Sequence, residues 1–173
     1  MNDFKIRPAT IDDAFGIATV QYNGWQETYR GIIHDSYLDA MSVEKGFERW
    51  KKNLQSPKGF IDVMTNREDE VIAFTSGGKN RTTEFNCDAE IFSLYLLKKY
   101  QGLGLGKQLL IHGVTRLNKS AFKSFCVFVL AKNPTVQFYK KFNPDLEKRI
   151  KTKIAETEYD EMVLGWSDII GFL

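Results

Sequence analysis

The chain has 173 residues, 43% of them hydrophobic and 27% charged, with a formal net charge of +2. This size predicts one domain over residues 1–173, and so small and dispersed an excess of Lys and Arg gives no reason to expect a nucleic-acid surface. No apolar run reaches membrane-spanning length and the N-terminus lacks a secretory signal, so a cytoplasmic protein that binds no membrane is expected.

The first predicted elements are a strand and a helix. Residues 4–7 alternate between apolar and polar side chains, as half-buried strands do. Thr10 and Asp13 have the spacing of a helix cap, so a helix is expected from about residue 11. Gly24 and Gly31 predict that this helix ends or bends before the next one.

A second helix and two strands follow. Apolar residues at core spacing predict the helix over residues 37–54. Residues 60–64 and 71–75 are predicted strands, joined by a charged connection at residues 66–70. Gly77-Gly78 is expected to break the strand pattern.

The next predicted unit is a buried strand, a glycine turn and a helix. Residues 89–97 are apolar and suit a buried strand, and apolar residues then recur at helical spacing until about Asn118. Gly102, Gly104 and Gly106 lie between the two elements. They allow a tight turn and let a ligand approach the backbone, whose amides at a helix start can bind an anion such as a phosphate.

Two familiar phosphate motifs do not fit this turn. A P-loop needs four residues between its glycines and a hydroxyl after the lysine, whereas three residues separate Gly102 from Gly106 and Gln108 follows Lys107. The dinucleotide fingerprint fails as well, because Gln108 and Leu109 are not glycine. A plain glycine turn without a ligand remains the alternative.

The C-terminal third is predicted to complete the sheet. Residues 125–130 form another buried-strand run. Asn133 and Pro134 suit the start of a helix, as cap and first helical residue. Residues 149–154 and 159–166 then alternate around a turn and indicate a closing hairpin.

Three segments together resemble the GNAT superfamily of N-acetyltransferases. The acyl-coenzyme A loop of that family has Arg or Gln, two residues, Gly, one residue, and Gly or Ala. The matching segments are Gln101-x-x-Gly104-x-Gly106, the strand residues Leu94-Tyr95-Leu96, and Asn133-Pro134-x-x-x-Phe138-Tyr139-x-Lys141. The resemblance covers nearly the whole chain.

This resemblance implies an α/β (α+β) fold with a mixed, mostly antiparallel sheet of about seven strands and helices on both faces. It also implies acetyl-CoA as cofactor, in a cleft between the strands 89–97 and 125–130. The backbone of Leu94, Tyr95 and Leu96 would pair with the pantetheine arm, and Asn133 would hydrogen-bond that arm or act only as a helix cap. The residues expected to hold the pyrophosphate are Gln101, Gly102, Leu103, Gly104, Leu105, Gly106 and Lys107.

The resemblance assigns the catalytic groups too. Tyr139 would be the general acid for the leaving thiolate, the alternative being a buried structural tyrosine. Glu90 would be the general base acting through water, the alternative being an ordinary strand-end charge. Cys126 lies in an apolar run and is a poor nucleophile, so direct transfer is expected. Asn143-Pro144 replaces the family's Gly-Phe, and the proline is expected to make Asn143 extended.

The first helical pair of this family contributes much of the acceptor pocket. Trp25, Glu27, Tyr29 and Asp35 are therefore candidates for substrate contact, although the aromatic residues could simply belong to the core. Their acidic and aromatic character would suit a cationic amine. His34 could act as a base by its chemistry, but a lone loop histidine is more often only solvated.

The expected function is transfer of an acetyl group from acetyl-CoA to a primary amine of a small molecule or peptide. A catalytically silent CoA-binding or regulatory module with the same fold is the alternative, and an interaction protein is a third. The sequence suggests no metal site or disulfide, because Cys87 and Cys126 are far apart. The apolar residues 169–173 could form a homodimer contact or cover the protein's own core.

Overall fold

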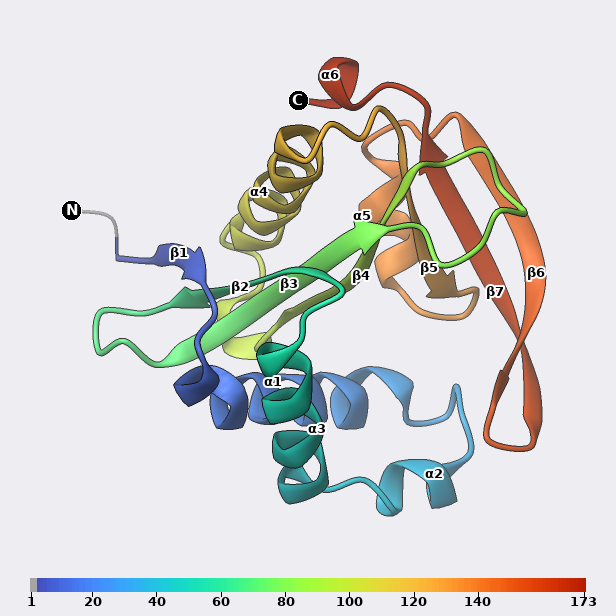
Figure 1. Ribbon diagram of the computed structural model, residues 1–173. Helices are drawn as coiled ribbons and strands as arrows, with labels where there is room; N and C mark the ends of the chain where they lie inside the picture. Colours follow the sequence, from blue (N-terminus) through green and yellow to red (C-terminus); the bar gives the residue numbers. More distant parts are fainter. Residues whose placement is uncertain (1–2) are drawn as a thin grey trace.

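The computed structural model describes residues 3–173, which form a seven-stranded sheet with helices on both faces (Figure 1). The strands are β1 (Lys5–Pro8), β2 (Gly59–Thr65), β3 (Val71–Lys79), β4 (Ala89–Leu96), β5 (Phe125–Leu130), β6 (Leu146–Ile154) and β7 (Thr157–Trp166). The helices are α1 (Ala14–Tyr29), α2 (Asp35–Asp39), α3 (Val43–Gln55), α4 (Leu105–Lys119), α5 (Thr135–Lys140) and α6 (Ile169–Phe172), with short 3-10 turns η1 (Ile11–Asp13) and η2 (Lys98–Tyr100).

The sheet has the strand order β1-β2-β3-β4-β5-β7-β6. All neighbouring pairs are antiparallel except β4 and β5, which run parallel. These two strands pair only at Ala89 with Phe125 and Glu90 with Cys126. Beyond these residues they separate, so the backbone edges that face each other lack sheet partners. The predicted mixed, mostly antiparallel sheet is confirmed.

Helices cover the sheet from both sides, with α4 on one face and α1 and α3 on the other (Figure 1). Leu109 of α4 is fully buried against Ala73 of β3. Ile17 of α1 and Trp50 of α3 belong to a second buried cluster around Phe74 on the opposite face. Because adjacent strand residues point to opposite faces, Ala73 and Phe74 anchor the two helical layers to one strand.

One of the two glycine predictions was wrong. β3 continues through Gly77 and Gly78, with a β-bulge beside Ser76, because the glycines make room for neighbouring backbone: a Cβ on Gly77 would lie 2.7 Å from the Glu90 carbonyl oxygen. α1 ends at Tyr29, just before Gly31, so the predicted end of this helix is confirmed, but the helix passes through Gly24 without a break. A Cβ there would lie 3.0 Å from the Tyr95 ring, so Gly24 permits close packing of α1 on β4.

Other boundaries differ from expectation for local reasons. The predicted second helix is two helices, α2 and α3, because Ser42 caps the start of α3 and accepts a hydrogen bond from the Lys45 amide at 3.2 Å. Asn143 is not extended before its proline: its φ of 49° lies in the left-handed region, which asparagine tolerates. The closing hairpin is confirmed, with Ala155 at a φ of 52° in its turn.

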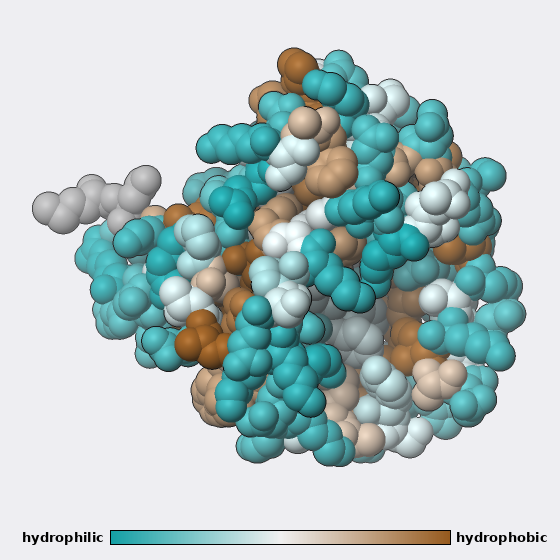
Figure 2. All heavy atoms as spheres, in the orientation of Figure 1, coloured by the Kyte–Doolittle hydropathy of each residue, from teal (hydrophilic) through white to brown (hydrophobic). Residues whose placement is uncertain are grey.

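The C-terminal helix α6 covers the protein's own core. Ile169 is 1% exposed, and the Phe172 ring lies 5.0 Å from that of Phe125. Ile170 and Leu173 are exposed, as isolated apolar side chains are elsewhere on a mostly hydrophilic surface (Figure 2). Among residues 3–173 there is no helix with the length and apolar character needed to span a bilayer.

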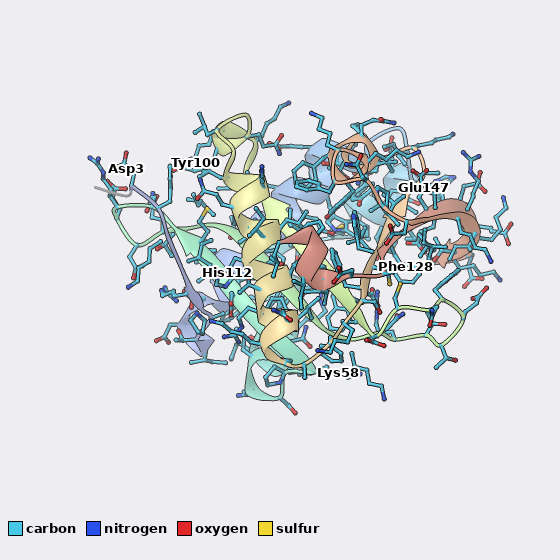
Figure 3. The ribbon with its side chains drawn as sticks, turned by 90° about the horizontal axis from the view of Figure 1, so that it is seen from above. Asp3, Lys58, Tyr100, His112, Phe128 and Glu147 are labelled. Atoms are coloured by element: carbon cyan, nitrogen blue, oxygen red, sulfur yellow. The ribbon has the colours of Figure 1, made fainter. Side chains whose placement is uncertain are left out.

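A charged cluster joins α4 to the sheet. Asp62 of β2 is fully buried, and its Oδ2 lies 2.5 Å from His112 Nε2 and 3.4 Å from Arg116 Nε. Figure 3, which looks down on α4, shows His112 on the side of the helix toward β1 and β2. A buried carboxylate needs such partners because burial removes its hydration.

We expect the His112→Leu variant to lose about 2 kcal/mol of unfolding free energy, because it leaves a buried carboxylate with one partner instead of two. Urea unfolding would measure the loss. The double variant Asp62→Leu/His112→Leu should be more stable than the single one, since no unpaired charge remains buried. Equal or lower stability of the double variant would contradict this account of the cluster.

Candidate active site

A cleft opens where β4 and β5 separate. The end of α1 closes it on one side and the start of α5 on another, so four elements meet around it. Its lining consists of Gly24 and residues 27–29 of α1, residues 91–96 of β4, Gln101, residues 127–129 of β5, and Asn133, Thr135 and Tyr139 at α5. The cleft therefore lies between the two strands for which the sequence predicted it.

The β4 edge offers unpaired backbone groups to this cleft. The Leu97 amide donates to the Ile72 carbonyl of β3 at 3.0 Å. Backbone groups of successive strand residues point to opposite neighbours, so those of Leu94 and Leu96 point into the cleft. The Leu96 carbonyl accepts a hydrogen bond from Gln101 Nε2 at 3.2 Å, which fixes that side chain at the mouth.

Tyr95 behaves differently from its two neighbours. Its backbone points toward Phe74 of β3, so it cannot pair with a ligand in the cleft as the sequence predicted for it. Its hydroxyl instead accepts a hydrogen bond from Trp25 Nε1 at 2.8 Å. Burial raises the pKa of the Tyr95 hydroxyl, so the group remains a neutral hydrogen-bonding partner.

The glycine turn leads from β4 into α4. Gly102 and Gly104 each have a φ of +78°, and a Cβ on either would meet no heavy atom within 4 Å. Their conformation explains these two glycines. Gly106 is different, since a Cβ there would make only ordinary contact, 3.8 Å from the Phe138 ring. Packing therefore gives no reason for a glycine at 106, whereas close approach of a ligand does.

The same turn presents a row of unused amides. Within the described chain, the first backbone hydrogen bond of α4 runs from the Gln108 amide to the Gly104 carbonyl, and the amides of residues 102–107 have no protein acceptor. They stand at the positive end of a 15-residue helix. This donor set fits a pyrophosphate. The Leu105 side chain is buried, so only its amide can contribute, while Lys107 is exposed beside the row.

Tyr139 of α5 reaches the cleft from the side opposite α1. Its side chain is 6% exposed, and its hydroxyl makes no hydrogen bond to any group in residues 3–173. Burial, reinforced by the neighbouring Tyr29, raises the pKa of Tyr139, so its proton is kept at neutral pH. A protonated hydroxyl without a protein partner is available to a ligand.

Asn133 ties α1 to α5. Its Oδ1 accepts from the Thr135 amide at 2.9 Å, and its Nδ2 donates to the Tyr29 hydroxyl at 3.0 Å. The predicted capping role is thus present, and the side chain also lines the cleft. Both polar atoms already have protein partners, so a bond to a ligand would use the remaining capacity of the amide.

Glu90 lies at the fork, at the last paired position of β4. Its carboxylate is 1% exposed and forms an ion pair with Arg81, where Nε to Oε2 is 3.0 Å. Glu90 is not among the residues that line the cleft. A second carboxylate, Glu161 of β7, lies nearby: burial raises its pKa, an effect that Arg81 opposes and Glu90 reinforces.

The four acceptor candidates separate into two pairs. Glu27 and Tyr29 line the cleft. Trp25 does not: it supports the wall, with its ring 4.8 Å from that of Tyr29. Asp35 is exposed and lies 3.4 Å from Arg30, away from the cleft. His34 lies next to Asp35 in the α1–α2 loop, and the His34 amide donates a hydrogen bond to the Tyr159 hydroxyl.

Several residues at the site were not predicted from the sequence. Thr28, Phe128 and Thr135 line the cleft without belonging to a motif. Arg81 reaches Glu90 because the loop after β3 folds back, where the Asn80 amide donates to the Asp88 carbonyl at 3.0 Å. The alternating apolar and polar residues near the C-terminus predicted a strand around Glu161. They did not show which residues this strand would face in the folded protein.

The two cysteines also meet, although they are 39 positions apart in sequence. Cys87 and Cys126 lie in one apolar cluster. The contact with the Cys87 thiol, together with burial, raises the pKa of Cys126. A protonated, buried thiol is a poor nucleophile, which agrees with the expectation of transfer without a covalent enzyme intermediate.

Known proteins are similar to this chain in sequence and in fold. The "Acetyltransferase (GNAT) family" matches residues 20–143. The chain is 32% identical over 164 residues to "Uncharacterized N-acetyltransferase YuaI" of Bacillus subtilis (strain 168), covering 95% of this chain and 93% of that protein.

Solved structures agree on the fold. The PaiA N-acetyltransferase of Thermoplasma acidophilum, in complex with coenzyme A, has a TM-score of 0.67 at 20% identity over 94% of this chain and 99% of that one. YncA of Salmonella typhimurium, with acetyl-CoA, has a TM-score of 0.69 at 14% identity over 96% and 94%. The family match covers most of the chain, and the amide row suits the cofactor that these neighbours hold. The chain therefore belongs to the GNAT family of N-acetyltransferases and is an acyltransferase that uses acetyl-CoA.

Proposed function

We propose that this enzyme transfers the acetyl group directly to a primary amine of a small molecule or peptide. The observation that carries the proposal is the fork between β4 and β5, with the amide row at its mouth and the Tyr139 hydroxyl inside it. Acetyl-CoA, when bound, supplies an acetyl thioester. The amides of residues 102–107 would hold its pyrophosphate, with Gln101 and Lys107 beside them.

The unpaired edge of β4 would orient the acyl arm. Leu94 and Leu96 present backbone donors and acceptors along the cleft, as a strand edge does to an added strand. The Leu96 amide is our candidate donor to the acyl oxygen, where an amide stabilises developing negative charge. Asn133 would support the arm from the α5 side.

Tyr139 and Glu90 are the proposed proton-transfer groups. Tyr139 keeps its proton at neutral pH and would donate it to the departing sulfur. Glu90 would accept the proton of the ammonium group through water, because its carboxylate lies behind the cleft lining. Glu27 and Tyr29 would contact the acceptor from α1. Trp25 would affect the acceptor indirectly, by positioning the Tyr29 ring. Asp35 would do so by holding the α1–α2 loop in place.

We expect Glu90→Gln to lower kcat at least about a hundredfold, because a general base has been lost. The glutamine still accepts a hydrogen bond from Arg81, so folding should be retained. Glu161→Gln is the matched comparison. If Glu161→Gln loses that activity while Glu90→Gln keeps wild-type kcat, the base is Glu161 and Glu90 is only a partner for Arg81.

The direct test is release of free thiol from acetyl-CoA in the presence of a panel of primary amines and peptides. Release that depends on an amine, with the acetylated amine identified by mass spectrometry, supports the proposal. Tight binding of acetyl-CoA by calorimetry without release for any amine would favour the silent CoA-binding module instead.

A further inference from the structure

A second recess lies on the α1 and α3 face of the sheet, next to the cleft. It has a volume of about 630 Å³, within the range of small-molecule sites. α3, the start of β2, the end of β3 and the segment after it surround it. Figure 2 looks at this face of the molecule, where most of the visible side chains are hydrophilic.

The charges around this recess have one sign. Four cationic side chains line it: Arg49, Lys58, Lys79 and Arg81. No Asp or Glu belongs to its lining. Four cations from four different segments, gathered without an acid, create a positive potential that favours an anion.

Most of this charge is not neutralised by neighbours. Arg49 donates to the neutral Gln21 side chain at 2.8 Å. Lys58, at the molecule's edge in Figure 3, and Lys79 form no ion pair with any residue from 3 to 173. Only Arg81 has an acidic partner, the Glu90 carboxylate at the fork.

The recess lies next to the cleft. Phe92 and Ser93 of β4 line both cavities. These residues follow Glu90 at the point where β4 leaves β5. A molecule seated in the recess would therefore lie beside Phe92 and Ser93, next to the cleft that holds the groups proposed to act on the amine. Trp50 and Ile61 supply apolar surface along the recess.

We infer that the acceptor is an amine that also carries an anionic group, a carboxylate or a phosphate, and that the recess lined by Arg49, Lys58, Lys79 and Arg81 binds this group. The inference rests on the proposed acetyl transfer and names its substrate class. Lys79 and Arg49 determine specificity by charge. The cationic amine suggested by the acidic residues of α1 and its loop is disfavoured, because its second charge would face like charges.

Matched amines test the inference. Phenylalanine and phenethylamine differ by a carboxylate, and O-phosphoethanolamine and ethanolamine differ by a phosphate; spermidine represents cationic amines. With the wild-type enzyme we expect the kcat/KM of the anionic member of at least one pair to be roughly tenfold to a hundredfold higher, as charge-assisted hydrogen bonds allow. The pair that responds identifies the anion.

Variants locate the effect. Lys79→Gln and Arg49→Gln should remove most of that preference, mainly through KM, and leave the neutral amine unchanged. Lys153→Gln, an exposed lysine of β6 outside the recess, is the matched control and should change neither value. Preference for neutral or cationic amines by the wild type, or an anionic preference that both variants retain, overturns the inference.

Failure of the proposed acetyl transfer would be distinguishable from failure of this site. If acetyl-CoA binds and no amine is acetylated, calorimetry with phenylalanine and O-phosphoethanolamine still tests the recess alone. Binding that is lost in Lys79→Gln and kept in Lys153→Gln would support the anion site; no heat from either compound would overturn it.

Discussion

Replacing Gly104 with glutamate is expected to abolish acetyl-CoA binding in a protein that still folds. Gly104 precedes α4 in the middle of the amide row, and its Cβ position faces open space. A carboxylate there would lie against the bound diphosphate. Two like charges about 4 Å apart near a protein surface repel by about 4 kcal/mol, so affinity should fall on the order of a thousandfold.

The strain of this substitution can be controlled for. Gly31 has a φ of +74°, and a Cβ on it would also meet no atom within 4 Å, but it lies in the loop after α1. Gly31→Glu and Gly104→Glu should therefore lose similar stability, about 1–2 kcal/mol each for a left-handed residue. Only Gly104→Glu should lose binding in calorimetry. Retained binding in that variant, or equal loss in both, would contradict the assignment of the loop.

The sequence predicted this loop because its signal is local. Strand 89–97 and the α4 helix have different apolar periods, and the glycines lie where one period changes to the other. A conformation with positive φ at Gly102 and Gly104 follows from their neighbours along the chain. The same locality explains why β5 and the closing hairpin were predicted within a few residues.

Features that depend on distant segments could not be predicted. Gly77 and Gly78 indicated a break, but the close approach of β2 and β4 keeps them in a strand. Arg81 meets Glu90 only because a loop returns to the sheet. The order of residues along the chain also does not show which charged side chains lie close together in the folded protein.

The acceptor side shows this most clearly. Acidic residues close in sequence, Glu27 and Asp35, suggested a cationic substrate. In the structure Asp35 lies beside Arg30 away from the cleft, whereas Arg49, Lys58 and Lys79 come together from separate elements. The proposed acceptor site therefore depends on tertiary arrangement, while the proposed pyrophosphate loop is one continuous segment of the chain.

Replacing Tyr139 with phenylalanine is expected to lower kcat about a hundredfold to ten-thousandfold, the range for loss of a general acid, while acetyl-CoA binding and stability stay near wild type. Stability should be kept because the hydroxyl has no protein hydrogen bond in the described chain and the ring remains in its buried position. Thiol release and calorimetry measure the two effects separately.

Tyr159→Phe is the matched control for the loss of a tyrosine hydroxyl. The Tyr159 hydroxyl accepts a hydrogen bond from the His34 amide at 3.0 Å, so its removal should cost about 1 kcal/mol of stability and leave kcat unchanged. The two variants should thus differ in opposite ways: Tyr139→Phe loses kcat and keeps its stability, whereas Tyr159→Phe loses stability and keeps its kcat.

The pH dependence of activity gives a further expectation for Tyr139. Burial raises the pKa of Tyr139, so deprotonation of this group should not limit activity on the alkaline side up to its ordinary pKa of 10.0. Wild-type kcat in Tyr139→Phe, or a loss of stability larger than that of Tyr159→Phe, would make Tyr139 a structural residue and leave the thiolate to be protonated by solvent.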